Sequence, residues 1–187
     1  MKVAVMTDTN SGILSEEAKE LGIFSMPMPV IIDGENYVEG VNLSRAVFFE
    51  ILMKDAEVTT SQPSPGELMD MWDNILKSGY DEIIYIPMSS GLSSSQRNSD
   101  VFAQDYEGRV MIADNHRISV TQRQAVMDAV MLSGAGYDAA GIKKVLEDTA
   151  YDSVVYLAVD TLDYLKKTGR VNSTAATVGN EIGRAHV

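Results

Sequence analysis

The sequence contains no cysteine and only two histidines, His116 and His186, among its 187 residues. Disulfides and thiolate chemistry are therefore excluded, and two histidines do not make the His/Cys cluster of a typical metal site. Basic residues are also scarce, because 15 Lys and Arg stand against 27 Asp and Glu, for a net charge of −12. Nucleic acids and anionic membranes require a basic surface, so neither is expected as the main partner.

Long apolar runs are missing as well. No stretch approaches the length of a membrane span, and residues 1–8 lack the apolar core of a signal peptide and have the pattern of a strand. The remaining composition is that of an ordinary globular protein, with 45% apolar and 22% charged residues. A chain of this length holds one domain and part of another. We expect the protein to reside in the cytoplasm.

Hydroxyl side chains cluster at two places where the chain is expected to turn. An apolar strand at residues 83–86 ends in the serine loop, residues 89–95, which contains Gly91 and is predicted to start a helix at Leu92 or Ser93. One helix earlier, residues 59–64 form a second hydroxyl-rich turn. Helix N-termini attract anions, so the two turns could face one anionic ligand. A flexible Ser/Gly connector is the alternative for the serine loop.

Several shorter signals outline the elements around these turns. Ser15 is expected to cap a first helix, and Ser44 a second helix with core residues at helical spacing: Val47, Phe48, Ile51 and Leu52. Apolar residues from Met26 to Ile32 and at 37–38 flank a Gly-containing turn at residues 33–36 and predict two strands. Ser64, Pro65 and Glu67 form the S-x-x-E capping box of a helix that ends near Gly79.

Later elements continue the alternation of strands and helices. A strand at residues 110–113 precedes Asp114, and a helix over 119–133 has an apolar face that includes Val120. A further helix is expected over 138–148. This order predicts an α/β domain over residues 1–150, with a parallel sheet covered by helices on both faces. Ligands bind beyond the carboxyl ends of such strands, where Asp8, the serine loop and Asp114 are expected.

The pattern changes after residue 150, and we expect a second, α+β domain to begin there and to continue to residue 180. Residues 154–159 predict a strand, and residues 161–171 a short helix closed by a glycine. Reverse translation of residues 181–187 permits the start of a common sequencing adapter. We therefore expect residues 181–187 to be a non-native tail on a chain truncated near Asn180, with a genuine short tail as the alternative.

Four motifs, in this order and spacing, resemble the DegV family of bacterial fatty-acid-binding proteins. They span nearly all of the plausible native chain and read MKVAVMTD from Met1, TSQP from Thr60, SSGLS from Ser89 and LKKTGRV from Leu165. The resemblance implies an α/β N-terminal domain, a C-terminal domain on an antiparallel sheet, and a long-chain fatty acid in a tunnel between them. It further implies presentation of the carboxylate to a fatty acid kinase, which makes an acyl-phosphate for phospholipid synthesis.

The resemblance also assigns the site residues. Thr60 and Ser93 match the hydroxyls that hold the fatty acid carboxylate, and Ser61 stands beside them as a further ligand-binding candidate. Supporting positions fall at Asp8, Gly91, Ser94, Asp114 and Arg170. The resemblance implies no catalytic residue, no metal and no cofactor. This chain departs from the family's usual residues at 94–95 and 115–116, which puts the loop shape and the partner surface in question.

Enzymatic and purely structural functions are the alternatives to fatty acid binding. A small-molecule phosphoester enzyme would use Asp8 and the Ser/Gly loops, but Asp8 lacks a second carboxylate two residues on, and no Gly-x-x-x-x-Gly-Lys loop is present. A serine hydrolase requires G-x-S-x-G, and the serine loop lacks the second glycine. A purely structural domain, in which the serines act only as helix caps, is the remaining alternative.

Overall fold

The computed structural model describes residues 1–54, 56–156, 158–159 and 161–172. The chain divides into two compact units, Met1–Val155 and Tyr156–Val187. Every strand that the structure describes lies in the first unit. Of the expected second domain the structure describes the part up to residue 172, and the predicted tail with His186 lies outside the described residues.

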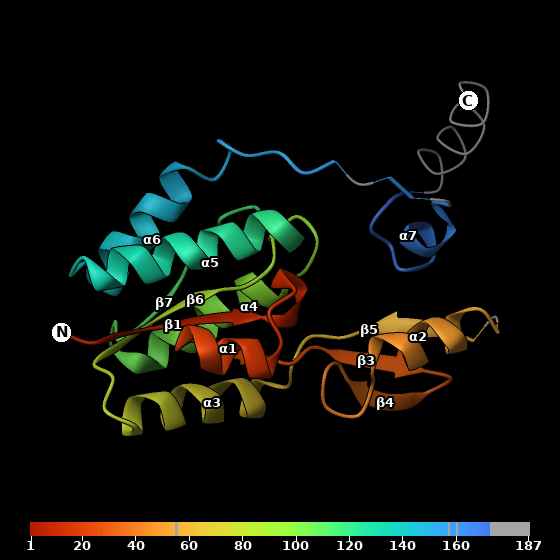
Figure 1. Ribbon diagram of the computed structural model, residues 1–187, viewed down its shortest axis with the longest axis horizontal. Coiled ribbons are helices and arrows are strands. Elements are labelled where there is room, and N and C mark those ends of the chain that lie inside the picture. Colours follow the sequence, from red (N-terminus) through yellow and green to blue (C-terminus); the bar gives the residue numbers. More distant parts are fainter. Residues whose placement is uncertain (55, 157, 160, 173–187) are drawn as a thin grey trace. The chain divides into compact units, whose positions relative to one another are not determined.

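The first unit is built on a four-stranded parallel sheet (Figure 1), as predicted. β1 (Val3–Asp8) pairs with β6 (Glu82–Ile86) in the register Val3↔Glu82 to Thr7↔Ile86. All six residues of β1 are buried, as expected for a strand covered on both faces. In spatial order, the strands are β2 (Phe24–Met26), β1 (Val3–Asp8), β6 (Glu82–Ile86) and β7 (Val110–Ile112).

Helices cover both faces because side chains alternate along each strand. Val5 and Ile84 pack on the face with α1, α5 and α6, whereas Met6 and Tyr85 pack on the face with α3 and α4 around the single, fully buried Trp72. Figure 1 shows α5 and α6 above the strands and α3 below them. The helices are α1 (Ser15–Leu21), α3 (Pro65–Lys77), α4 (Ser95–Ala103), α5 (Ser119–Gly134) and α6 (Ala139–Asp148), with 3₁₀ turns η1 (Thr9–Ser11) and η2 (Gln104–Tyr106).

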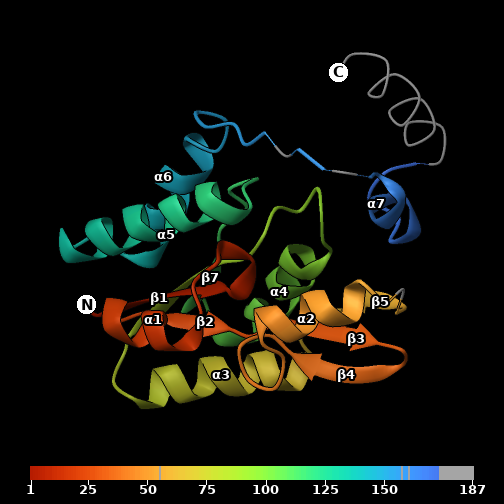
Figure 2. The ribbon, with the colours of Figure 1, turned by 45° about the vertical axis from the view of Figure 1, so that its right-hand side comes forward.

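A second, antiparallel sheet of three strands packs against α2 (Arg45–Leu52), and Figures 1 and 2 show these elements beside one another. Its order is β4 (Glu35–Val38), β3 (Pro29–Ile32) and β5 (Val58–Thr60). Asp33 and Gly34 join β3 to β4 with φ values of 50° and 84°, as a two-residue hairpin with positive φ at both positions requires. The predicted single strand from Met26 to Ile32 is wrong, because Met26 ends β2 in one sheet and Pro29 begins β3 in the other.

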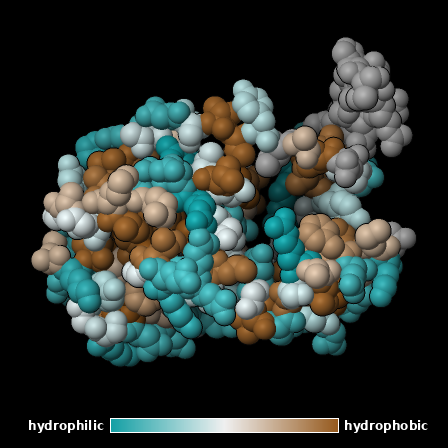
Figure 3. Space-filling view, in the orientation of Figure 1, coloured by the Kyte–Doolittle hydropathy of each residue, from teal (hydrophilic) through white to brown (hydrophobic). Residues whose placement is uncertain are grey.

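The predicted core role of α2 is only partly correct. Phe48 and Ile51 pack against the small sheet, but α2 has no fully buried residue and Val47 is 44% exposed. Hydrophobic side chains therefore show at the surface over α2 (Figure 3). Val120 likewise does not join the buried face of α5 and is exposed, because helical spacing places it on the side opposite the buried residues Gln122, Ala125, Val126 and Ala129.

Two predicted helix starts are wrong by a few residues. α1 has Leu14 as its N-cap and Ser15 as its first helical residue, so Ser15 makes no capping bond. α4 begins at Ser95 instead of Leu92 or Ser93, because residues 90–92 form a turn first. The predicted caps Ser44 and Ser64 are confirmed.

In the second unit, the short helix is confirmed as α7 (Asp163–Lys167). It is followed by Gly169 at φ 74°, and the amides of Arg170 and Val171 return to the Leu165 carbonyl at 2.8 and 3.1 Å. The strand predicted over 154–159 is wrong for the residues of that range that the structure describes, since none of them is in a strand.

Candidate functional site

The strand order identifies one edge of the main sheet as the candidate site. The chain runs from β1 outward to β2, and then from β6 outward to β7 in the opposite direction. The order therefore reverses between the neighbours β1 and β6, and ligands of open α/β sheets bind at such a switch point, beyond the carboxyl ends of the strands. β1 ends here in Asp8, and β6 leads here into the serine loop.

Asp8 is fully buried and connects three segments that are distant in the sequence. Its Oδ1 accepts from the backbone N–H and side-chain amide of Asn10 and from Gln122 Nε2, each at 3.0 Å, and its Oδ2 accepts from the N–H of Met88 at 3.0 Å. Burial raises the pKa of Asp8, and the hydrogen bonds from Met88, Gln122 and Asn10 act in the opposite direction. Asp8 thus caps η1 and holds the start of the serine loop.

Gln122, on α5, is the residue of this network that the sequence analysis missed. Its Nε2 lies 3.2 Å from Thr7 Oγ1, 3.0 Å from Asp8 Oδ1 and 3.2 Å from the Ile86 carbonyl. It therefore joins α5 to the ends of both β1 and β6. The available signal was a polar residue on the helix face that otherwise buries Ala125, Val126 and Ala129.

The serine loop is held largely by its own backbone and by neighbouring loops. Its amides donate to carbonyl and side-chain oxygens, so few of them remain to bind an anion. The bonds run from Met88 to Asp8 Oδ2 (3.0 Å), Ser89 to Arg117 O (2.9 Å), Ser90 to Asp114 Oδ1 (3.3 Å), Gly91 to Ser89 Oγ (3.2 Å), and Leu92 and Ser93 to Ser89 O (3.0 and 3.2 Å). This differs from the expectation of a loop whose own amides form the anion site.

The Ser93 hydroxyl is placed differently from those amides. Its Oγ accepts from the N–H of Ser95, the first residue of α4, at 3.1 Å. Among the described residues no acceptor is found for the Ser93 hydroxyl hydrogen, so this hydrogen is suited to an external oxygen. Ser94 is the N-cap of α4 but makes no side-chain capping bond, and it is exposed.

The second hydroxyl-rich segment lies beside α4. Thr60 ends β5, paired with Val30, so it belongs to a strand and not to a turn as predicted. Ser61 continues the pairing through its N–H to the Pro29 carbonyl at 3.2 Å, and its hydroxyl donates to the Gln62 carbonyl at 3.2 Å. The Gln62 side chain then accepts from Asn98 Nδ2, on α4, at 2.9 Å. The structure therefore brings the second hydroxyl-rich segment into contact with α4, the helix that follows the serine loop.

The remaining predicted positions are divided between the units. Asp114 follows β7 at the candidate edge, where it accepts from the amides of Ser90 and His116 at 3.3 and 3.4 Å. His116 Nδ1 lies 3.7 Å from Asp114 Oδ1, and its ring stacks on the exposed Tyr151. Arg170 lies in the second unit, where its Nη1 donates to the Thr168 carbonyl at 3.1 Å.

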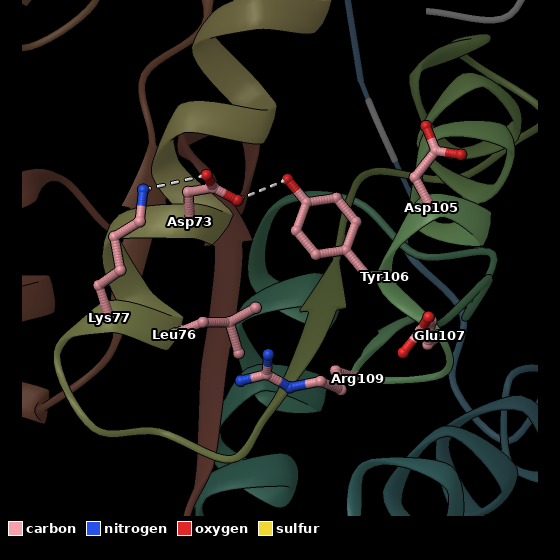
Figure 4. Close-up of a pocket in the computed structure, with 7 residues that line it drawn as sticks. All are labelled: Asp73, Leu76, Lys77, Asp105, Tyr106, Glu107 and Arg109. Carbon is pink, nitrogen blue, oxygen red and sulfur yellow. Dashed lines mark hydrogen bonds and ion pairs between the residues drawn. The ribbon is translucent and has the colours of Figure 1, made fainter.

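A polar pocket of about 310 Å³ lies at the opposite edge of the sheet and holds none of the predicted residues (Figure 4). Its polar groups satisfy one another, because Asp73 accepts from Lys77 Nζ at 3.1 Å and from the Tyr106 hydroxyl at 3.0 Å. Burial, followed by the hydrogen bond to Asp73, raises the pKa of Tyr106 to about 12. Arg109 turns to the Asp81 carbonyl. This pocket is therefore not the candidate site.

The described residues contain no group of three or more His, Cys, Asp or Glu side chains that could hold a metal ion. None of the helices described there is both long and apolar enough to cross a membrane.

Comparison with known proteins identifies relatives over nearly the whole chain. A DegV domain-containing protein from Listeria monocytogenes is 33% identical over 182 residues, and one from Deinococcus radiodurans 31% over 180 residues. Each alignment covers 96% of this chain and 64% of the relative. The chain thus spans less than two thirds of the length of these relatives.

The solved structures that this chain resembles also belong to DegV family proteins. A fatty-acid-binding DegV family protein from Thermus thermophilus is 27% identical with a TM-score of 0.85, and DegV, a fatty acid binding protein from Bacillus subtilis, is 29% identical with a TM-score of 0.82. Both alignments cover 96% of this chain and 64% of the other. The model of the family described as "Uncharacterised protein, DegV family" matches residues 2–182, and the chain belongs to the DegV family.

Proposed function

We propose that this protein binds a long-chain fatty acid, with the hydroxyls of Thr60 and Ser93 donating to its carboxylate. The observation that carries the proposal is the hydrogen bond of 2.9 Å between Gln62, two residues after Thr60, and Asn98 on α4, the helix that follows the serine loop. Ser93 supports it because its oxygen accepts from the N–H of Ser95, and no acceptor for its hydroxyl hydrogen is found among the described residues. Fatty acid binding by the Thermus and Bacillus relatives supports the choice of ligand.

The chemistry of the ligand fits the site and the chain. A carboxylate needs hydrogen-bond donors without a competing anion, and hydroxyls are neutral donors. Asp8 lies at the same edge, but it is fully buried and its oxygens are engaged by four donors. An acyl chain gains about 0.8 kcal/mol per buried CH₂ in an apolar channel. Ser61 has a smaller role in this proposal, since its hydroxyl already donates to the Gln62 carbonyl.

The proposal extends to the use of the ligand. We propose that the protein acts in the cytoplasm and presents the bound carboxylate to a fatty acid kinase, which forms the acyl-phosphate. The resemblance to the family is the support for this step. Arg170, in the second unit, is a candidate for bracing the second domain or for a position near the acidic head.

The phosphoester alternative is weakened by the geometry of Asp8. A nucleophilic or metal-binding carboxylate must present an oxygen to the substrate or the metal. Asp8 is fully buried, and its oxygens accept from Asn10, Met88 and Gln122. Asp8 is therefore suited to holding loops, and we do not assign it a catalytic role.

Native mass spectrometry with organic extraction tests the proposal on protein purified from a bacterial host. The 187-residue chain should be compared with the complete product of the source gene wherever that gene encodes more. We expect a co-purifying long-chain fatty acid that Thr60→Ala/Ser93→Ala loses, because each lost bond to a charged group costs about 1.5–3 kcal/mol, or about ten- to a hundredfold in affinity.

Thr59→Ala/Ser15→Ala is the matched control. Thr59 points to the opposite face of β5 from Thr60, and Ser15 makes no capping bond. This variant should retain the ligand. A wild-type protein that is empty, and stays empty when offered palmitate or oleate, would refute fatty acid binding.

A further inference from the structure

The amide side chains of Gln62 and Asn98 join the second hydroxyl-rich segment to α4. Asn98 lies on α4, three residues after its first residue, Ser95, and Gln62 follows Ser61 at the end of β5. Asn98 Nδ2 donates to Gln62 Oε1 at 2.9 Å, across 36 positions of sequence, and both side chains are half-buried. Neither residue belongs to the hydroxyl groups assigned to the ligand.

This hydrogen bond can affect the distance between Thr60 and Ser93. Thr60 belongs to the small antiparallel sheet, whereas Ser93 lies in a loop that leaves the parallel sheet. Their spacing therefore depends on how one sheet is held against the other. The segment after Thr60 is anchored to β3 by the Ser61 amide and to α4 by Gln62, before Ser64 caps α3.

The chemistry of the pair also suits an anion site. Two amides form a hydrogen bond without adding charge, whereas a carboxylate in either position would repel an anionic ligand nearby. In a chain with a net charge of −12, a neutral connection beside the site avoids that repulsion.

We propose that Gln62 and Asn98 are positioning residues of the carboxylate site: their hydrogen bond sets the spacing between the hydroxyls of Thr60 and Ser93. The inference rests on the proposed function, because it concerns the head-group part of that site. Loss of the pair lets the segment after β5 move relative to α4, so the carboxylate is held less well, whereas contacts of the acyl chain do not depend on this hydrogen bond.

A comparison of two ligands separates this role from general destabilisation. Palmitate and hexadecanol have the same chain length, but only palmitate carries a carboxylate. Asn98→Ala and Gln62→Ala should each weaken palmitate binding by about three- to tenfold and leave hexadecanol binding unchanged. The double variant should bind palmitate about as well as either single variant, because both substitutions remove the same bond. Asn74→Ala, at an exposed position of α3, is the matched control.

A second measurement needs no ligand. The Ser61 amide is hydrogen-bonded to the Pro29 carbonyl, and its hydrogen exchange should become faster in Asn98→Ala and stay unchanged in Asn74→Ala. Wild-type protein that binds palmitate, with variants that bind it equally well, overturns the inference alone. Wild-type protein that binds no palmitate overturns the proposed function, and unchanged exchange at Ser61 then overturns the positioning role as well.

Discussion

At the scale of single residues, Asp8 shows how position decides the role of a side chain. A carboxylate at the end of a first strand is compatible with catalysis, but the surroundings of Asp8 favour a structural role. Asp8 is fully buried, and it accepts from Asn10, Met88 and Gln122. Its role is therefore to hold together the ends of β1 and β6 and the helix α5, behind the serine loop.

The stability of the protein should carry a pH dependence from Asp8. Burial raises its pKa in the folded state above the unfolded value of about 3.9. The folded state then binds more protons than the unfolded state between the two pKa values, so the free energy of unfolding falls as pH rises through this window. Relative to Asp8→Asn, the wild type should lose stability from about pH 4 upward and level off above the folded pKa.

Urea unfolding at a series of pH values, followed by the fluorescence of Trp72, measures this difference. Trp72 is the only tryptophan and is fully buried, so its emission reports unfolding. Asp152→Asn, at an exposed position, is the control. If the free energy of unfolding of the wild type, relative to that of Asp8→Asn, stayed constant or rose with pH, the raised pKa would be contradicted.

At the scale of elements, the helix N-termini show which serines act as N-caps and which do not. Ser64 Oγ accepts from the Glu67 amide at 3.2 Å, and the Glu67 carboxylate accepts from the Ser64 N–H at 3.0 Å, which completes the capping box of α3. Bonds from the Ser64 hydroxyl and amide lower the pKa of Glu67. Ser15 has the same residue type and is also followed by glutamates, yet it lies one position inside α1.

The two serines should therefore respond differently to the same substitution. Ser64→Ala should cost about 1 kcal/mol of unfolding free energy through loss of the cap, whereas Ser15→Ala should change it by less than about 0.5 kcal/mol. Urea denaturation of both variants under one set of conditions makes the comparison. Equal losses in the two variants would show that the cap assignment of α1 or α3 is wrong.

At the scale of the whole molecule, the buried core belongs to the first unit. The buried residues of its three hydrophobic clusters all lie between Val3 and Leu146, and the first unit ends at Val155. The main parallel sheet and the helices on both of its faces are complete within this range. The first unit therefore has what an independently folding domain requires.

A fragment of residues 1–155 should fold alone. We expect cooperative urea unfolding and the blue-shifted emission of a buried Trp72, because the residues that surround Trp72 lie within the fragment. Far-UV circular dichroism and fluorescence provide the two readouts, with the 187-residue chain as the reference. Noncoincident transitions, or solvent-exposed Trp72 emission before denaturant is added, would show that the first unit depends on the rest of the chain.

Local patterns in the sequence determined the elements and several of their ends. The apolar runs of β1, β6 and β7, the capping box of α3 and the glycine after α7 are short-range signals, since periodicity and capping act over a few residues. The parallel sheet with helices on both faces followed from their order. Errors arose where a run crossed from one sheet to another, as from Met26 to Pro29, or where a strand formed without alternation, as at Thr60.

The tertiary structure alone decided which polar groups meet. Gln122 reaches Asp8 across 114 positions, and Asn98 reaches Gln62 across 36. No local pattern specifies such pairs, because they depend on strand order and on how the small sheet is held against the parallel one. The sequence thus determined that hydroxyls gather at two segments, and folding joined the segment after Thr60 to α4, the helix that follows the serine loop beyond the carboxyl end of β6.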